Sequence, residues 1–390
     1  MTGFRVALVG RYPVPYPYSE HRGDHPTMAA LAARSAALHL LVEAADGQAR
    51  EWSDGRLHVH YAPARGHGAP RAARFLRWAT RRLRSLHRDV GLDVINGSDP
   101  LGIAAGLLAR RETGVPVAAQ VQGQLLDAPP SIGPVRMVGT RSLMRALVRR
   151  ADAVRCLYAD AGRLALRAGV PPERLLVFPS RCDAARFDPA GHGPVEPGHL
   201  LFVGNLVEGK GVRDLLAALR IVCAARPEVR LTIAGSGPAE SAWRALADRL
   251  AVAHAVRYVG RVPHDRLPGL LATAAALVLP SHHEATPRVI MEAMAMGRPV
   301  VATAVGGVPD LLDDRVHGRL VAAHAPAALA DALLDVLGGP PWAAGLAERS
   351  RARAIASFSV PRHLDMLEAL HARAVGRGAD PSRPPPGDPR

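Results

Sequence analysis

The chain has 390 residues and a formal net charge of +14, from 49 lysines and arginines against 35 aspartates and glutamates. Its 48% hydrophobic and 22% charged residues are typical of a globular protein and exclude a disordered one, and at roughly 150 residues per domain the length predicts two or three domains. Aromatic residues make up only 4% of the chain, which argues against a protein that stacks the bases of single-stranded nucleic acid in spite of the positive charge.

Short strand-like runs alternate with helical runs in the first half of the chain, and this alternation predicts parallel sheets built from βαβ units. The predicted strands are Arg5–Val9, His39–Glu43, Leu57–Tyr61, Val94–Gly97, Val117–Gln122, Ala153–Leu157 and Leu175–Phe178. Helices are expected over Ala29–Leu38 and Leu101–Thr113, among others. We interpret residues 1–187 as an N-terminal Rossmann-like lobe.

A segment with three prolines and three glycines, residues 188–199, predicts a linker, after which the alternation restarts. The elements expected next are strands Leu200–Val203, Arg230–Ala234, Val256–Val259, Ala276–Leu279 and Pro299–Ala302, with a helix over Val212–Ala225. We predict a second lobe over 200–355, a C-terminal helix over 356–375 that returns to the first lobe, and a disordered tail over 376–390. The expected fold class is α/β, with two doubly wound Rossmann-like lobes facing across a cleft and ligands at the carboxyl ends of the strands.

Several features predict a cytoplasmic location. No apolar run reaches the roughly 18 residues that a membrane span requires, and the N-terminal segment Phe4–Gly10 reads as a buried first strand rather than a signal peptide. Cys156, Cys182 and Cys223 are far apart and form neither a CxxC pair nor a disulfide framework.

Arginines cluster over Arg71–Arg88 and Arg136–Arg150, where basic and apolar positions recur at helical spacing. We interpret these clusters first as helix faces exposed to solvent. The alternative is that such a face binds peripherally to the inner surface of an anionic membrane, and nucleic-acid binding is the least favoured of the three interpretations.

The first candidate ligand-binding loop follows the predicted strand Leu200–Val203 and contains Lys210, the only lysine of the chain. Its glycines allow close backbone approach, and the following helix presents free N–H groups to an anion. Lys210 would add a point charge for a phosphate. The loop is not a Walker A motif, because no Ser or Thr follows the lysine. An ordinary strand-to-helix turn with a surface lysine is the alternative.

The second loop runs from Leu279 to Thr303 and carries Glu284 before a predicted helix and Glu292 within it. A carboxylate in a helix that otherwise reads as buried needs hydroxyl or cationic partners, and a ribose diol would meet that need. The alternative is that Glu292 faces water. A third loop follows the predicted strand Pro299–Ala302 and contains the turn Gly306-Gly307, whose backbone amides can approach a ligand.

Together these loops resemble glycosyltransferase family 4, retaining enzymes of the GT-B fold that use nucleotide sugars. The run from Ser281 through Glu284 and Glu292 is similar to the family's E-x7-E motif and its continuation. The loop Gly204–Gly211 resembles the family's G-R-L-x-x-E-K-G loop, and the turn at Gly306 resembles the one that follows in the family. The resemblance covers residues 151–320 well and the first 150 residues poorly.

The resemblance implies catalytic roles for Lys210 and Glu284. Lys210 would bind the donor diphosphate and stabilise the charge that builds on the leaving nucleotide, and Glu284 would lie beside the donor sugar. Glu292 would hold the ribose hydroxyls. The remaining donor-binding positions implied are Gly204, Asn205, Gly211, Arg261, Val262, Ala285, Thr286 and Arg288.

Two positions depart from the family pattern. Asn205 stands where the family has an arginine beside the lysine, and Gln122 stands where it often has a histidine near the reacting sugar. Tyr12 lies in a proline- and tyrosine-rich segment that replaces the family's glycine pair after the first strand. We take Gln122 and Tyr12 as acceptor-side candidates. The candidates to replace the missing cation are Arg213, Arg288, His282 and His283.

The predicted function is a retaining transfer of a hexose from a UDP- or GDP-sugar to a glycan, a lipid-linked glycan or a small metabolite. The resemblance implies an enzyme that needs no metal, and the chain has no Asp-x-Asp sequence to supply a metal site. No cofactor is predicted besides the nucleotide-sugar co-substrate. Two alternatives stay open: a non-catalytic nucleotide-sugar-binding subunit, or another two-lobed nucleotide-sugar enzyme such as an epimerase.

Overall fold

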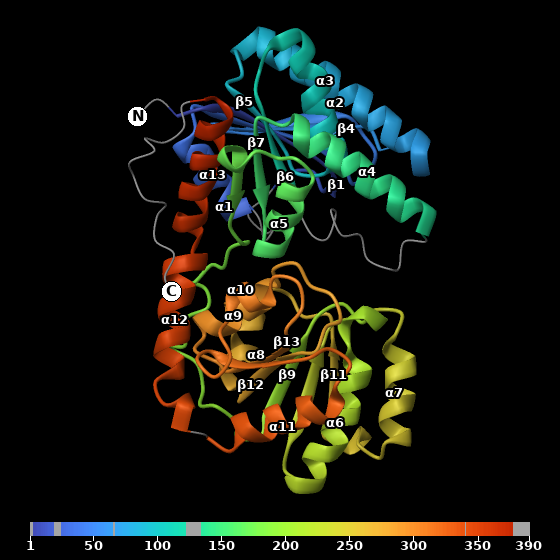
Figure 1. Cartoon of the computed structure of the whole chain (residues 1–390), viewed down its shortest axis with the longest axis vertical. Helices are drawn as coiled ribbons and strands as arrows, with labels where there is room; N and C mark the ends of the chain where they lie inside the picture. Colours follow the sequence, from blue (N-terminus) through green and yellow to red (C-terminus); the bar gives the residue numbers. More distant parts are fainter. Residues whose placement is uncertain (1–2, 19–24, 65–66, 122–133, 340, 377–390) are drawn as a thin grey trace. The chain divides into compact units, whose positions relative to one another are not determined.

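The structure is a computed structural model that describes residues 3–18, 25–64, 67–121, 134–339 and 341–376. The chain forms two compact units, unit 1 with Met1–Phe178 and Leu364–Arg390 and unit 2 with Pro179–His363. Each unit contains a mainly parallel sheet with helices packed on it (Figure 1). The predicted fold class, α/β with two Rossmann-like lobes, is therefore confirmed.

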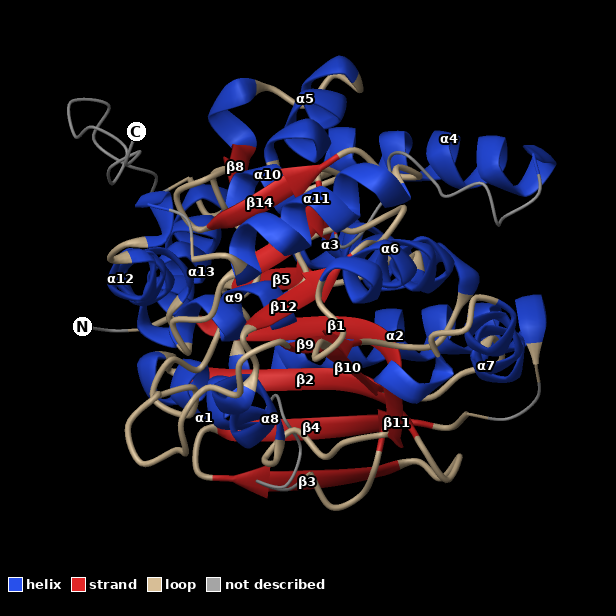
Figure 2. Cartoon of the chain, turned by 90° about the horizontal axis from the view of Figure 1, so that it is seen from below, coloured by secondary structure: helices blue, strands red, loops and turns tan. Residues whose placement is uncertain are grey.

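The sheet of unit 1 has the strand order β3-β4-β2-β1-β5-β6-β7-β8 among the described residues. Its strands are β1 (Arg5–Val14), β2 (Ala37–Ala44), β3 (Arg50–Asp54), β4 (Leu57–Ala62), β5 (Val94–Gly97), β6 (Val117–Val121), β7 (Ala153–Cys156) and β8 (Leu175–Val177). Neighbouring strands pair in parallel except β3, which runs antiparallel to β4 at the edge of the sheet (Figure 2). Strands buried on both faces are nearly continuous apolar runs, which makes most of them recognisable from sequence.

Helices cover both faces of this sheet. They are α1 (His25–Arg34), α2 (Gly68–Val90), α3 (Pro100–Thr113), α4 (Pro134–Arg150), α5 (Ala159–Arg167) and, from Leu364 onward, α13 (Val360–Ala374). Side chains alternate along a strand, so Ile95 of β5 packs in an apolar cluster with Phe75 of α2 and Ala105 of α3. Its neighbour Asn96 meets His371 of α13.

The sheet of unit 2 has the order β11-β10-β9-β12-β13-β14 among the described residues, and all its neighbouring strands are parallel. Its strands are β9 (His199–Val203), β10 (Arg230–Ala234), β11 (Val256–Gly260), β12 (Ala276–Leu279), β13 (Val300–Thr303) and β14 (Gly318–Val321). The helices are α6 (Val212–Ala225), α7 (Glu240–Arg249), α8 (Leu267–Thr273), α9 (Arg288–Ala295), α10 (Val308–Leu311), α11 (Pro326–Leu337) and α12 (Leu346–Phe358).

The strand order of unit 2 changes direction between β9 and β12. The chain continues from β9 to β10 and β11 on one side and then to β12, β13 and β14 on the other. In an open parallel sheet such a switch point separates the loops at the carboxyl ends of the two strands and leaves room for a ligand. The loops that contain Lys210 and Glu284 follow these two strands.

The helix predicted over Ala29–Leu38 is wrong in its last turn. α1 ends at Arg34, and β2 begins at Ala37. Ser35 closes the helix by donating its hydroxyl to the carbonyl of Leu31 at 2.8 Å. The following leucines are then buried in β2 beside β1, so tertiary burial outweighs the helical propensity of the alanines.

Most predicted strands agree with the structure to within one or two residues at each end, and three strands differ by more. β3 and β14 were not expected: β3 is a polar, largely exposed edge strand, and β14 is only half-buried along its middle. β1 extends beyond the predicted end at Val9 as far as Val14, with an irregular register between Val9 and Pro13.

The N-terminal segment of unit 1 ends at Phe178 rather than at the predicted residue 187. Cys182 and Phe187 are buried in the apolar core of unit 2, and the Cys182 amide donates to the carbonyl of Phe358 at 2.7 Å. The predicted linker 188–199 accordingly lies within unit 2, and its last residue, His199, begins β9. In the region predicted as one C-terminal helix, α12 ends at Phe358 and α13 begins at Val360. Residues 377–390 of the predicted tail lie outside the described residues.

A hydrogen-bond network of buried polar side chains connects four elements of unit 1. Arg155 on β7 donates to Gln120 Oε1 on β6 at 2.6 Å, and the Gln120 amide donates to Asn96 Oδ1 on β5 at 2.9 Å. The Asn96 amide meets Nε2 of His371 on α13, also at 2.9 Å. A guanidinium can only donate, so it orients each amide in turn and requires His371 to accept at Nε2. His371 is therefore neutral, and its complete burial lowers its pKa from 6.5 to about 4.

This network makes the stability of unit 1 depend on pH. As the pH falls, the unfolded chain takes up a proton at this histidine near 6.5, whereas the folded chain does so only near 4. The contribution of neutral His371 is thus fully present above the unfolded pKa and is lost as the pH falls toward the folded one. His371→Gln keeps an acceptor but cannot titrate. Denaturant unfolding at about pH 7 and about pH 5 should show a smaller loss of stability for this variant than for the wild type.

The matched control is His254→Gln, which replaces an exposed histidine of unit 2 and should leave the pH dependence of the wild type unchanged. Equal losses in the wild type and His371→Gln would contradict the assignment of a neutral, buried His371.

Candidate functional site

Lys210 and Glu284 lie 74 positions apart in the sequence and form an ion pair, with 2.6 Å between Nζ and Oε1. The Ser281 hydroxyl donates to the same carboxylate oxygen at 2.8 Å. The side chains of Lys210 and Glu284 are 25% and 10% exposed, respectively, so the pair is partly shielded from water. The only lysine of the chain is therefore not a free surface residue, and the alternative of an ordinary turn with a surface lysine is not what the structure shows.

The loops after β9 and β12 touch through their backbones. Gly211 has φ +66°, and a Cβ atom there would lie 1.9 Å from the carbonyl oxygen of Pro280. The His282 amide donates to the carbonyl of Gly209 at 2.9 Å. No side chain fits between the loops at Gly211, and this close approach brings the lysine of one loop to the glutamate of the other.

The third loop, after β13, packs against the loop of Glu284. A Cβ atom at Gly306, where φ is +54°, would lie 1.7 Å from the carbonyl oxygen of Glu284. The Gly307 amide donates to the carbonyl of Ala285 at 2.8 Å. Thr286 is buried in the same loop. The sequence-predicted loops at Lys210, Glu284 and Gly306 thus form one continuous structure.

Glu292 is only 2% exposed although it is charged. Its Oε1 lies 2.9 Å from His264 Nε2 and 3.6 Å from a guanidinium nitrogen of Arg288, one turn earlier in α9. The expectation that a carboxylate in this buried helix requires polar partners is confirmed, and the alternative that it faces water is wrong.

His264 was missed in the sequence. It follows β11 in the run Val262-Pro-His-Asp265, at the carboxyl end of a strand, and this position was the available signal. Its Nδ1 lies 3.1 Å from a guanidinium nitrogen of Arg186, which can only donate. Nε2 therefore carries the proton and donates to Glu292.

The other predicted donor-side residues occupy neighbouring positions of unit 2. Arg261 is exposed directly after β11, and Val262 packs against the core of the unit. Gly204 lies against the ring of Phe202. Asn205 is exposed, and its carbonyl accepts the Val207 amide at 3.0 Å.

Three of the four side chains proposed to replace the missing arginine have a carboxylate partner, Arg288 in Glu292 and the other two as follows. Arg213 donates twice to Glu208, at 2.7 and 3.1 Å, and this guanidinium lowers the pKa of the Glu208 carboxyl. His282 Nε2 lies 2.9 Å from Asp214. His283 is exposed.

The acceptor-side candidates belong to unit 1. Tyr12 lies in β1, and a Cβ atom added to Gly10 would lie 2.4 Å from its ring and 2.2 Å from the hydroxyl oxygen of Ser98. Gln122 lies outside the described residues.

Two family models match the chain, one in each half. The model described as "Glycosyl transferase 4-like domain" matches residues 25–181, and the model described as "Glycosyl transferases group 1" matches residues 197–338, which include Lys210, Glu284 and Glu292.

Curated proteins give a similar result. The chain is 32% identical over 319 residues to the D-inositol 3-phosphate glycosyltransferase of Mycobacterium bovis, over 76% of this chain and 64% of that protein. It is 35% identical over 214 residues to the glycogen synthase of Mycobacterium tuberculosis, over 54% of this chain and 52% of that protein. The chain therefore spans less than two thirds of the length of these relatives.

Solved structures share the fold. Sucrose-phosphate synthase from Thermosynechococcus elongatus superimposes with a TM-score of 0.79 at 19% identity, covering 96% of this chain and 100% of that one. HepE of Anabaena in complex with UDP-glucose gives a TM-score of 0.70 at 18% identity, covering 94% and 98%. These likenesses show that the chain has the GT-B fold. With a glycosyl transferase 4-like domain over residues 25–181 and a group 1 domain over residues 197–338, the chain belongs to the GT-B glycosyltransferases that these family models describe.

The contact at Gly211 is testable within a single loop. Gly211→Ala places a methyl group against the Pro280 carbonyl in a left-handed backbone conformation, and we expect it to lower the free energy of unfolding by about 2–4 kcal/mol. Gly209→Ala is the matched control, because a Cβ atom there meets nothing within 4 Å, and it should change stability by less than about 0.5 kcal/mol. Denaturant unfolding measures both; equal effects would show that the two loops do not touch at Gly211.

Proposed function

We propose that the protein transfers a hexose from a UDP-sugar to a hydroxyl group of a glycan, a lipid-linked glycan or a small metabolite, with retention of the anomeric configuration. The observation that carries the proposal is the Lys210–Glu284 pair at the switch point of unit 2, within the part matched by the family model. UDP is favoured over GDP because HepE has been solved with UDP and with UDP-glucose. One relative is named for D-inositol 3-phosphate and another for glycogen, so both small and polymeric acceptors remain in the proposal.

Lys210 is the group we assign to the leaving diphosphate. In the structure its ammonium is neutralised by Glu284. A bound diphosphate replaces the carboxylate as the partner of the ammonium, so the lysine is already oriented toward the charge that grows as the glycosidic bond breaks. Asn205 contributes an amide without charge and Arg213 is held by Glu208, which leaves Lys210 as the main cation of this loop. The chain has no Asp-x-Asp sequence, and the proposal therefore includes neither a catalytic metal nor a cofactor.

In this proposal Glu284 and Glu292 bind different parts of the donor. The two contacts described for Glu292 use Oε1, and we assign Oε2 to the ribose hydroxyls. Glu284, released by Lys210, then accepts from hydroxyls of the donor sugar, with Ala285 and Thr286 beside it. Oε1 of Glu284 accepts from Ser281, and in the proposed complex the carboxylate also accepts from the donor sugar. These hydrogen bonds make it a poor nucleophile, which favours front-face attack by the acceptor over a covalent intermediate.

Replacement of Lys210 tests the assignment. We expect Lys210→Ala to lower the rate of hexose transfer or donor hydrolysis with UDP-sugars by about 10²-fold or more, because the leaving diphosphate loses its cation. Arg220→Ala removes an exposed cation of α6 and is the matched control, expected within a few-fold of the wild type. Wild-type turnover in Lys210→Ala would refute the role.

The exposed Asn205 in place of an arginine favours one competing function, a nucleotide-sugar-binding subunit without activity. Calorimetry with UDP and UDP-glucose on the wild type separates the two functions. Binding accompanied by neither hydrolysis nor transfer to any acceptor supports the binding subunit.

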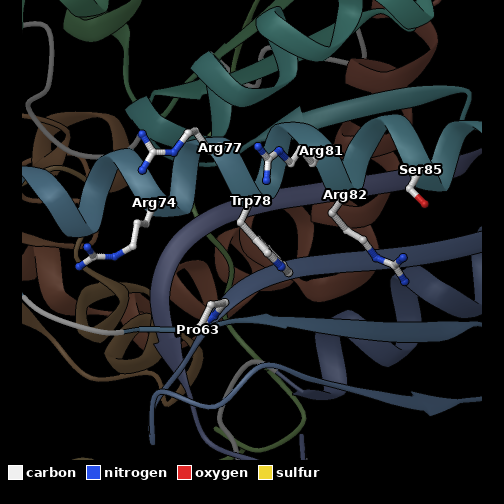
Figure 3. A pocket seen from close by; sticks show the side chains of 7 residues that line it. All are labelled: Pro63, Arg74, Arg77, Trp78, Arg81, Arg82 and Ser85. Atoms are coloured by element: carbon white, nitrogen blue, oxygen red, sulfur yellow. The ribbon is translucent and has the colours of Figure 1, made fainter.

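We also propose that α2 of unit 1 contacts an anionic membrane surface. Arg74, Arg77 and Arg81 are exposed and recur at helical spacing along it. Figure 3 shows Trp78 pointing from the helix toward Pro63, in a hollow that these arginines also line. An arginine-rich face with an amphipathic ring suits the headgroup region of anionic lipids. None of the helices in the described parts of the chain is both long and apolar enough to cross a membrane.

Charge reversal tests this surface. We expect a variant with Glu at positions 74, 77 and 81 to sediment much less with phosphatidylglycerol vesicles than the wild type, and added salt should weaken the wild-type binding because it screens exposed charges. The control, with Glu in place of the exposed Arg220, Arg249 and Arg257 of unit 2, carries the same net charge. Equal loss in both variants would mean that net charge rather than this face drives sedimentation.

A further inference from the structure

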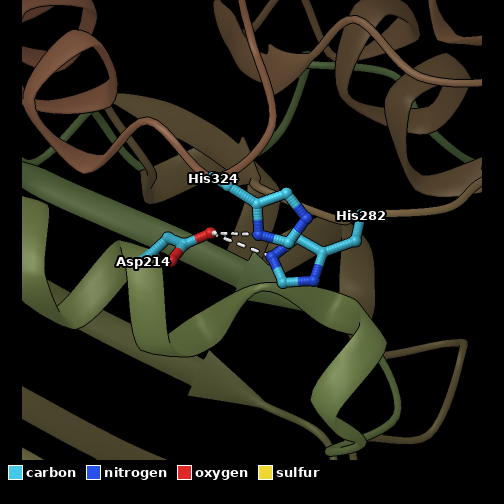
Figure 4. Close-up of side chains that lie close together, drawn as sticks. All are labelled: Asp214, His282 and His324. Atoms are coloured by element: carbon cyan, nitrogen blue, oxygen red, sulfur yellow. Dashed lines mark hydrogen bonds and ion pairs between the residues drawn. The ribbon is translucent and has the colours of Figure 1, made fainter.

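Three potential metal ligands converge in unit 2, and the proposed transfer uses none of them. Asp214 lies in the first turn of α6, His282 in the loop after β12, and His324 in the loop between β14 and α11. Figure 4 shows both imidazole rings next to the Asp214 carboxylate. Strands β9, β12 and β14 belong to one parallel sheet, so the loops at their carboxyl ends meet at one edge.

The distances fit a small cation. Nε2 of His282 and Nδ1 of His324 lie 2.9 and 3.9 Å from the same oxygen, Oδ2 of Asp214, and the ligand atoms of the three residues all lie within 4.8 Å of one another. A tetrahedral zinc ion with bonds of about 2.0–2.2 Å separates its ligand atoms by about 3.3–3.6 Å. The two measured separations bracket this value, so small rotations of the side chains are enough to enclose an ion.

The chemistry of the cluster selects the kind of ion. Two imidazoles and one carboxylate form a donor set suited to Zn²⁺ and neighbouring transition metals, whereas Mg²⁺ prefers oxygen ligands alone. The side chain of His324 is 69% exposed, so an ion can reach the cluster from solvent and keep a fourth position for water.

The cluster is attached to the loops of the candidate site. The His282 amide donates to the carbonyl of Gly209. A Cβ atom added to Gly211, between Lys210 and Asp214, would lie 3.3 Å from Nε2 of His282. An ion held by Asp214, His282 and His324 would join three loops that otherwise depend on backbone contacts.

We propose that Asp214, His282 and His324 form a binding site for Zn²⁺ or a similar transition-metal ion that cross-links these three loops. The site is structural or regulatory and takes no part in the transfer proposed above.

The test uses the metal-free protein with all 390 residues of the chain. We expect about one equivalent of Zn²⁺ to bind in calorimetry and to raise the melting temperature, because an ion that binds only the folded chain stabilises it by mass action. His324→Ala, at an exposed position that should not disturb folding, and Asp214→Asn should each weaken Zn²⁺ binding at least about 10-fold. Mg²⁺ should leave the melting temperature of the wild type and of both variants unchanged.

His254→Ala is the control for nonspecific binding to an exposed histidine, and it should bind Zn²⁺ as the wild type does. Co²⁺ provides a second readout, since a tetrahedral site gives it a visible absorption that His324→Ala should lack. Wild-type Zn²⁺ affinity in both His324→Ala and Asp214→Asn, or no Zn²⁺ binding by the wild type, would overturn the proposal. The transfer rate of Lys210→Ala and the Zn²⁺ affinity of the metal-site variants are measured in separate experiments. The proposed function and the proposed metal site can therefore fail independently.

Discussion

The contact between the loops that follow β9 and β12 is the constraint on which the site in unit 2 depends. At Gly211 the backbone of one loop lies against the Pro280 carbonyl of the other, at a distance that excludes any side chain. Gly306 makes the equivalent contact with the carbonyl of Glu284. Because these two glycines have no side chain, the backbones of the three loops can touch. This contact places Lys210 and Glu284 close enough to form their ion pair.

The charged groups of Lys210, Glu284 and Glu292 each have an internal partner in the structure. Lys210 is neutralised by Glu284, and Glu292 accepts from His264. Burying an unpaired charge is costly, so these pairs allow a set of ionic groups to be kept inside a small domain. A ligand with both a diphosphate and hydroxyl groups can replace the partners one by one, and the proposed donor has this composition.

The two asparagines of the chain illustrate how little composition says about role. Asn96 is fully buried in unit 1, where it transmits the orientation set by Arg155 through Gln120 to His371. Asn205 is exposed in unit 2, beside the loop of Lys210. Residue type alone does not separate the two, and only their surroundings distinguish a buried structural amide from an exposed one.

The sequence by itself determined the alternation of strands and helices, because buried parallel strands are continuous apolar runs, and it determined the chemical character of the loops at Lys210, Glu284 and Glu292. It did not reveal the polar edge strand β3, nor that Leu38 leaves its alanine-rich helix for β2, since both depend on neighbours distant in the chain. Only the tertiary structure decided the partners: His264 for Glu292, Arg155 for Gln120, and Asp214 for two histidines. The physical reason is that periodicity is a local property, whereas the carboxyl ends of parallel strands bring together residues whose separation in the sequence carries no signal.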